Sequence, residues 1–298
     1  MKFRRRAEID PQDSFTCSSL TGPFDRKRFD RQRGLDRLIN QAFLIIAILA
    51  IGLALGLPLL GLSGMWVVSS LLAPLALLGA WLVLTQTTAQ VGRSLAMIAV
   101  IVERDPGSAE QAIHKALERY PVMRWARLLT YHRLATLRHR QRRFEEAGEL
   151  CFAVLSEPLR GPAASARAHL LLMLAECKLE TGDLPGAYHA LDTLFRTRLS
   201  LVEALQRLAL QTRYELMVNA PDAAIRAGQH KIELAELMPP PQCGAMHAML
   251  AYAAQRTDQP RVAAWLWERA RMITPPGLLE QFERGAFSVG VVEATEPG

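Results

Sequence analysis

The sequence has no Asp, Glu, Lys or Arg between Arg37 and Arg93, and most of the residues in this run are aliphatic or glycine. One transmembrane helix needs about 20 apolar residues, so the run is long enough for two spans. Pro58, Gly61 and Gly64 interrupt it near the middle. Because such residues favour a reversal of the chain, the sequence predicts a two-span transmembrane hairpin over residues 38–87.

Basic residues are concentrated before this run. Residues 1–37 hold ten Lys or Arg against six acidic residues, whereas the turn of the predicted hairpin holds none. Lys and Arg near the end of a span are retained on the cytoplasmic side. We therefore expect a basic cytoplasmic arm over residues 1–37 and an integral membrane protein with both termini in the cytoplasm. Abundant Arg and Ala suggest a GC-rich bacterial coding sequence, and the layout resembles bacterial inner-membrane repeat proteins, so we expect the bacterial inner membrane.

Gly52 and Gly56 lie four residues apart within the predicted first span. Small residues at this spacing let two helix backbones approach closely. They could pack the two helices of the hairpin against each other, or join two copies of the chain in a homodimer. The spacing alone leaves both arrangements open.

Similar segments recur through the rest of the chain, and each contains an alanine that can be aligned with the others. These alanines, which follow one another at nearly even steps, are Ala112, Ala147, Ala187, Ala223 and Ala263. A repeat of this length is typical of a helical solenoid, in which each helix pair buries its apolar face against its neighbours. We expect an all-α protein with an α-solenoid of four to five helix pairs over residues 93–285 and a C-terminal tail over residues 286–298.

The last copy shows the repeat pattern most fully, with Leu250, Ala251, Asp258, Ala263, Trp267, Ala270 and Pro275. Together with Leu174, Ala175 and Gly182 of an earlier copy, these residues resemble the tetratricopeptide repeat, a helix-turn-helix unit with a shorter period than the one found here. The turn near Asn219 is also irregular. A general α-solenoid with longer helices is therefore the alternative. The resemblance implies a concave face that binds proteins or peptides.

Catalytic and metal-binding motifs are missing from the sequence. It has no phosphate-binding loop, nucleophile elbow, zinc-protease motif or kinase signature. Its four cysteines form no CxxC pair and its seven histidines are scattered, so we expect no catalytic residues, no cofactor and no metal ligands. After the apolar run, 25 basic residues face 23 acidic ones. We expect no nucleic-acid partner, since such a protein would concentrate basic charge in its folded domain.

Residues 131–143 contain five Arg, two His and no acidic residue. The register of the resemblance places part of this run on the concave face, together with residues of the next copy: His132, Thr136, His139, Arg140, His169 and Glu176. Because Arg suits bidentate contact with carboxylate or phosphate, an acidic peptide or an anionic headgroup is the expected ligand class. The alternative is a solvated face neutralised by Glu145, Glu146 and Glu149.

These features favour a non-enzymatic, membrane-anchored scaffold or adaptor. Its helical repeats would bind a protein or peptide partner at the cytoplasmic face of the membrane. An alternative from another class is an accessory or regulatory subunit of a larger membrane complex, either a transporter or a biosynthetic enzyme. In that case the transmembrane hairpin would be the main interaction element.

Overall fold

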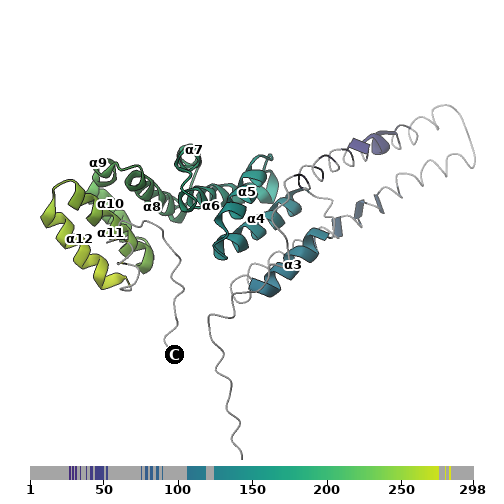
Figure 1. Cartoon of the computed structure of the whole chain (residues 1–298). Helices are drawn as coiled ribbons and strands as arrows, with labels where there is room; N and C mark the ends of the chain where they lie inside the picture. Colours follow the sequence, from purple (N-terminus) through teal and green to yellow (C-terminus); the bar gives the residue numbers. More distant parts are fainter. Residues whose placement is uncertain are drawn as a thin grey trace, which may run out of the picture. The chain divides into compact units, whose positions relative to one another are not determined.

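The computed structural model describes residues 106–118 and 124–274, scattered residues between 27 and 89, and residues 279 and 282. The chain divides into two compact units, Met1–Leu137 and Arg138–Gly298, so the division falls inside α4 (Arg124–Arg140). The described residues are mostly helical and contain no strand. Figure 1 shows the helices in chain order, from α3 (Pro106–Glu118) to α12 (Pro260–Ile273).

The predicted transmembrane hairpin is contradicted. A span needs about 20 apolar residues in one continuous helix. Within the part of the chain that the structure describes, no helix combines that length with that apolar character. Between residues 38 and 87, the longest described helical stretch is 44–49, and most of the range lies outside the described residues. The predictions of a hairpin over 38–87 and of an integral membrane protein in a bacterial inner membrane, with cytoplasmic termini, are therefore wrong.

The proposed homodimer contact depended on the same segment. Gly52 is a described residue, but Gly56 lies outside the described residues. A homodimer through these two glycines therefore stays a prediction.

In the first unit, the described core comes from α3 and α4. Ala109 and Ile113 of α3 are fully buried, as is Ala126 of α4. The ring of Phe29 is also buried and meets the ring of Tyr131 edge-on, with centroids 5.0 Å apart. Aromatic pairs favour this edge-to-face geometry, so residues far apart in the sequence share one apolar core here.

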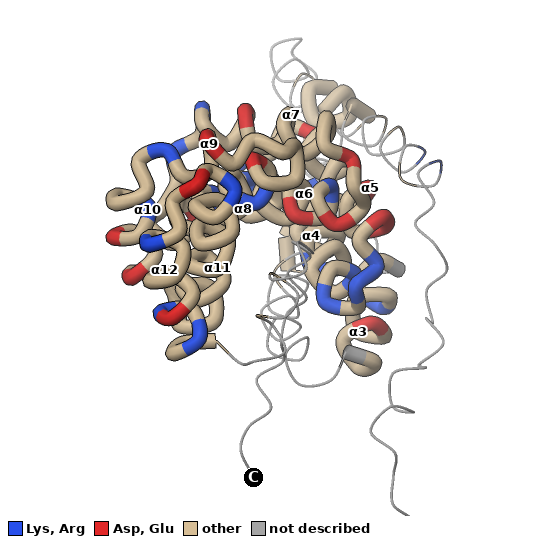
Figure 2. Tube along the Cα trace, turned by 60° about the vertical axis from the view of Figure 1, so that its left-hand side comes forward, with Lys and Arg blue, Asp and Glu red and all other residues tan. Residues whose placement is uncertain are grey.

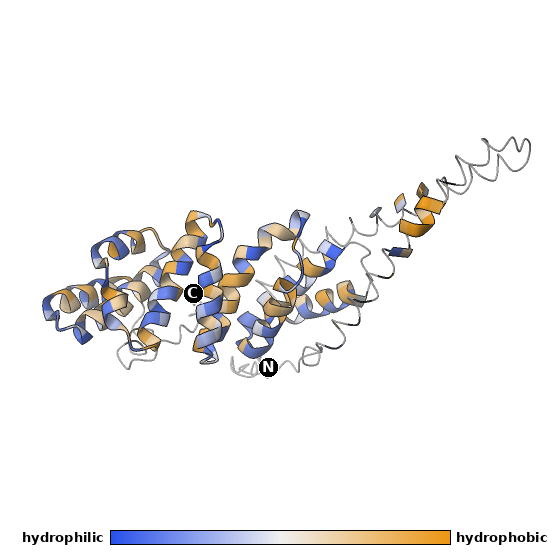
Figure 3. Cartoon of the chain, turned by 90° about the horizontal axis from the view of Figure 1, so that it is seen from above, coloured by the Kyte–Doolittle hydropathy of each residue, from blue (hydrophilic) through white to orange (hydrophobic). Residues whose placement is uncertain are grey.

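The second unit continues from the last turn of α4 through a series of helices. These are α5 (Phe144–Leu155), α6 (Arg167–Glu180), α7 (Leu184–Phe195), α8 (Leu201–Met217), α9 (Pro221–Ile225), α10 (Gly228–Ala235), α11 (Pro240–Arg256) and α12, with a short 3₁₀ helix, η2 (Gly161–Ala166), before α6. Helix α6 packs on α5 and α7, and α11 packs on α12, while α8 packs on both α6 and α11. In Figure 3 these helices carry both polar and apolar residues, as expected for helices with one face in a core.

The same turn follows α4, α6, α8 and α11. Its central residue has a positive φ in each case, namely Arg142 (58°), Gly182 (76°), Asn219 (57°) and Asp258 (57°). The N–H of the next residue donates to the carbonyl five residues earlier, at 2.8 to 2.9 Å. This is the Schellman hydrogen bond, which satisfies carbonyls left open at a helix end. The described part of the chain therefore contains four copies of one helix-turn-helix unit at nearly even spacing.

A buried alanine lies five residues after the left-handed residue in every copy. Ala147, Ala187 and Ala224 are 0 % exposed and Ala263 is 5 % exposed. Three of these are alanines aligned from the sequence. In the copy around Asn219, however, the buried residue is Ala224, whereas the aligned Ala223 is only partly buried. The lack of a larger side chain at this position allows close approach of the neighbouring helix.

The copy around Asn219 differs because its second helix is split in two. Helix α9 ends after five residues, Ala227 adopts a left-handed conformation with φ 54°, and α10 follows. Lys231 Nζ donates to the Ala224 carbonyl at 2.7 Å and pairs with Glu215 at 3.1 Å. A cation at the carbonyl end of a helix is stabilising, so this buried Lys holds the break between α9 and α10.

We predict that Gly182→Ala lowers the free energy of unfolding by about 1 kcal/mol, because a Cβ disfavours positive φ. A Cβ at this position would meet no atom within 4 Å, so the cost comes from the backbone conformation alone. Chemical denaturation of the full chain, followed by circular dichroism, measures the change.

Gly148→Ala in α5 is the matched control. Its Cβ would make only an ordinary contact at 3.5 Å with the Cys177 side chain. Because Ala is the better helix former, this variant should gain stability of up to about 1 kcal/mol. Equal effects of the two substitutions would contradict the left-handed turn at Gly182.

Candidate functional site

The six residues predicted for the concave face are divided between the two units. His132 and Thr136 lie in the first unit, where His132 is buried and the Thr136 hydroxyl donates to the His132 carbonyl at 3.0 Å. His139, Arg140, His169 and Glu176 lie in the second unit. A single surface formed by all six therefore stays a prediction.

The structure brings two of the predicted residues together. His139 Nε2 lies 3.1 Å from Glu176 Oε2, which connects the last turn of α4 to α6. The His139 ring also meets the ring of Phe144 edge-on, with centroids 5.4 Å apart. Arg140 and His169 are exposed. The predicted face thus includes the contact between His139 and Glu176 and the exposed side chains of Arg140 and His169.

Similar polar contacts link the first helices of successive copies, which are α4, α6, α8 and α11. Arg213 Nη1 of α8 lies 2.9 Å from Glu180 Oε1 of α6, and these side chains are only 3 % and 7 % exposed. Arg256, at the end of α11, donates to Asn219 Oδ1 at 2.9 Å in the turn after α8. We call the three contacts His139–Glu176, Glu180–Arg213 and Asn219–Arg256 the inter-helix ladder. The ladder joins the first helices of successive copies near their C-terminal ends.

Part of the basic run is used inside the second unit. Arg138 is almost fully buried, with Nε 3.4 Å from Glu146 Oε2, and its Nη1 donates to Gln141 at 2.8 Å. Arg143 pairs with the same Glu146 carboxylate. The exposed guanidinium groups near this turn belong to Arg140 and Arg142. Figure 2 shows basic residues gathered on the part of the tube formed by α4 and the following turn.

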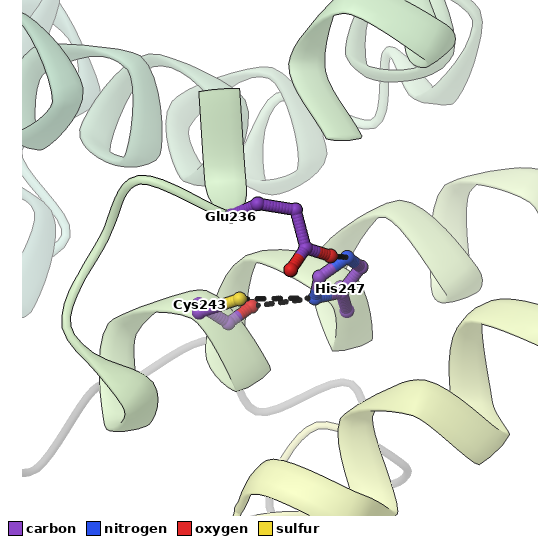
Figure 4. Close-up of side chains that lie close together, drawn as sticks. All are labelled: Glu236, Cys243 and His247. Atoms are coloured by element: carbon purple, nitrogen blue, oxygen red, sulfur yellow. Dashed lines mark hydrogen bonds and ion pairs between the residues drawn. The ribbon is translucent and has the colours of Figure 1, made fainter. Parts of the chain in front are cut away.

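A second cluster lies between α10 and α11 (Figure 4). Glu236 directly follows α10, while Cys243 and His247 come from α11. One potential ligand atom of each residue lies within 4.8 Å of the other two. Cys243 and His247 are four residues apart, so they share a helix face. Cys243 Sγ lies 3.5 Å from His247 Nδ1, and Glu236 Oε1 lies 3.4 Å from His247 Nε2.

The hydrogen bonds of His247 define its tautomer. Its Nδ1 lies 3.0 Å from the main-chain oxygen of Cys243. A carbonyl oxygen can only accept, so Nδ1 carries the proton and the neutral ring keeps its lone pair on Nε2. Nε2 is buried and has no hydrogen-bond partner among the described residues. Burial is the largest cause that lowers the His247 pKa, which favours the neutral ring.

The other two residues of the cluster differ in charge. Arg269 of α12 donates to Glu236 Oε1 at 2.7 Å, and this hydrogen bond is the main cause that lowers the Glu236 pKa. Cys243 is buried, and burial followed by the charge of Glu236 raises the pKa of its thiol. The cluster therefore combines a carboxylate, a thiol and a neutral imidazole.

This cluster was not predicted from the sequence, because we expected no metal ligands among the scattered histidines. The available signal was the spacing of Cys243 and His247, which places both on one face of a helix. Glu236 precedes α11 by a loop and comes from a different helix. Its approach depends on how α10 packs on α11, which the local sequence pattern does not encode.

Comparison of the chain with known protein-family models, curated proteins and solved structures yields no match. The resemblance to the tetratricopeptide repeat therefore stays an expectation that rests on residues such as Leu250, Gly182 and Pro275. The functional argument rests on the repeat geometry, the inter-helix ladder and the cluster on α11.

We predict that Arg213→Met lowers the free energy of unfolding by about 3 to 5 kcal/mol, because it leaves the Glu180 carboxylate buried without its partner. The double variant Glu180→Gln/Arg213→Met should recover most of this loss, since neither charge remains. Chemical denaturation of the full chain measures both variants.

The exposed pair formed by Asp192 of α7 and Arg196, which directly follows the helix, provides the control. Arg196→Met should change stability by about 0.5 kcal/mol or less, as expected for an exposed ion pair on a helix. An Arg213→Met variant as mild as Arg196→Met would show that the Glu180–Arg213 contact does not join α6 to α8.

Proposed function

We propose that this chain is a non-enzymatic scaffold or adaptor that binds a protein or peptide partner through its helical repeats. The proposal is carried by the recurrence of one helix-turn-helix unit around Arg142, Gly182, Asn219 and Asp258. Repeat arrays place successive helices side by side and create extended binding surfaces. Such a surface suits an extended partner segment, which a single helix pair would be too short to hold.

The binding face is formed by α6, α8 and residues 138–140 at the end of α4; we call it the first-helix face. The inter-helix ladder supports this choice, because it fixes the spacing of the first helices before a partner arrives. A preorganised surface loses less conformational freedom on binding. Helix α8 packs on α6 and also carries the partly exposed side chains Gln206, Arg207 and Leu210. These supply both polar and apolar contacts.

The charge near this face favours an acidic partner. Arg140 and Arg142 are exposed, and guanidinium groups suit bidentate contact with carboxylates. Contacts between exposed charges are screened within roughly 8 Å at physiological ionic strength. An acidic peptide bound here should therefore be released as the salt concentration rises.

Selection of a random peptide display library against the full chain tests the proposal. We expect the selected peptides to be enriched in Asp and Glu and to bind more weakly at high salt. Reversal of an exposed charge at an interface mainly weakens the electrostatic attraction between the two binding partners. Arg140→Glu should therefore weaken binding of a selected peptide by about tenfold.

Arg261→Glu is the matched control, because Arg261 is also exposed but lies on α12. It should leave the peptide affinity nearly unchanged. A library that yields no peptide contradicts the binding function. Peptides that bind regardless of salt and of Arg140 contradict the acidic partner and shift the proposal to an apolar contact on α8.

A further inference from the structure

We propose that Glu236, Cys243 and His247 form a binding site for a divalent transition-metal ion of the zinc class. Thiolate, imidazole and carboxylate are the three ligand types that zinc binds in proteins. All three are present here, with their ligand atoms within 4.8 Å of one another. The site is independent of the first-helix face and does not depend on the proposed partner.

His247 is already arranged as a ligand. Metal-binding histidines commonly donate their second ring N–H to a backbone carbonyl, which fixes the ring and leaves the other nitrogen for the metal. His247 makes this contact through Nδ1 to the Cys243 carbonyl at 3.0 Å. Its Nε2 is buried without a hydrogen-bond partner among the described residues and faces the Glu236 carboxylate at 3.4 Å. A cation would satisfy the buried lone pair and the carboxylate together.

The distances require only a small adjustment. Zinc bonds of about 2.0 to 2.3 Å at tetrahedral angles separate two ligand atoms by roughly 3.3 to 3.8 Å. The distance between His247 Nε2 and Glu236 Oε1 is already 3.4 Å. The widest separation in the cluster, which is no more than 4.8 Å, must shrink by at most about 1.5 Å. Rotation of the Cys243 side chain about its one torsion can supply this movement.

Arg269 orients the carboxylate. Its Nε donates to Glu236 Oε1 at 2.7 Å, which fixes the oxygen that lies 3.4 Å from His247 Nε2, and the second lone pair of that oxygen remains available to a metal ion. Hydrogen bonds of this kind position metal-binding carboxylates in known sites. In Figure 4 the Glu236 carboxylate lies over the pair formed by Cys243 and His247. The Glu236 side chain is 39 % exposed, so an ion can enter from solvent, and three protein ligands leave a fourth position for water.

Titration of the metal-free full chain with Co²⁺, a spectroscopic substitute for zinc, tests the site. We expect a thiolate-to-cobalt charge-transfer absorption that saturates at about one equivalent and disappears when Zn²⁺ is added. Cys243→Ser should abolish the absorption. Glu236→Gln should weaken Co²⁺ binding at least about tenfold.

Two matched controls remove the same residue types elsewhere. Cys151→Ser removes a buried cysteine of α5, and His230→Gln removes an exposed histidine of α10. Both should leave the Co²⁺ titration unchanged. Because a change at buried Cys243 can disturb folding, circular dichroism checks each variant, and the partly exposed Glu236 provides a variant less sensitive to this problem.

The midpoint temperature of thermal unfolding gives a second readout. A metal that binds only the folded chain raises it by mass action, so Zn²⁺ should stabilise the wild-type chain and not Glu236→Gln. Folded wild-type protein without the Co²⁺ absorption would overturn the site. A folded Cys243→Ser or Glu236→Gln variant with an unchanged titration would overturn it equally.

Discussion

A left-handed residue after each first helix turns the chain back, and the hydrogen bonds closed around it hold the repeat together. The N–H groups of Asp183 and Gln259 bond to Lys178 and Ala254, and the other two copies repeat this pattern. Each such bond satisfies a carbonyl that the helix end would otherwise leave open. The turn also sets which side of the second helix faces the first, so the alanine five residues later becomes buried. Burial of the alanines and the spacing of the first helices both follow from this turn.

The four turns do not use equally suitable residues. Gly182 adopts a positive φ at no steric cost, and Asn219 and Asp258 belong to types that tolerate it. Arg142 is the least suited to a positive φ, but ion pairs fix the side chains on either side of it. Arg138 and Arg143 share the Glu146 carboxylate. In the next copy an ion pair at 2.7 Å between Lys178 and Asp183 occupies the equivalent positions. Side-chain ion pairs thus reinforce the turn from both sides in these two copies.

Part of this architecture could be predicted from the sequence. The alanines at 147, 187 and 263 repeat at helical-repeat spacing, and small or turn-forming residues precede them. The split between α9 and α10 could not be predicted, because Lys231 binds carbonyls of α9 through a tertiary contact. The predicted hairpin failed because, within the part of the chain that the structure describes, no helix combines the length and the apolar character of a span. The approach of Glu236 to α11 likewise depends on packing and not on local pattern.

The backbone angle φ at residues 142, 219 and 258 tests the central claim most directly, because these non-glycine residues adopt positive φ only when the turn requires it. Nuclear magnetic resonance of the full chain can measure it from backbone chemical shifts and from the coupling between the amide and α protons. The account predicts a left-handed conformation at all three residues, with φ near the observed 57° to 58°. A negative φ at any of them would contradict the equivalence of the four repeat copies.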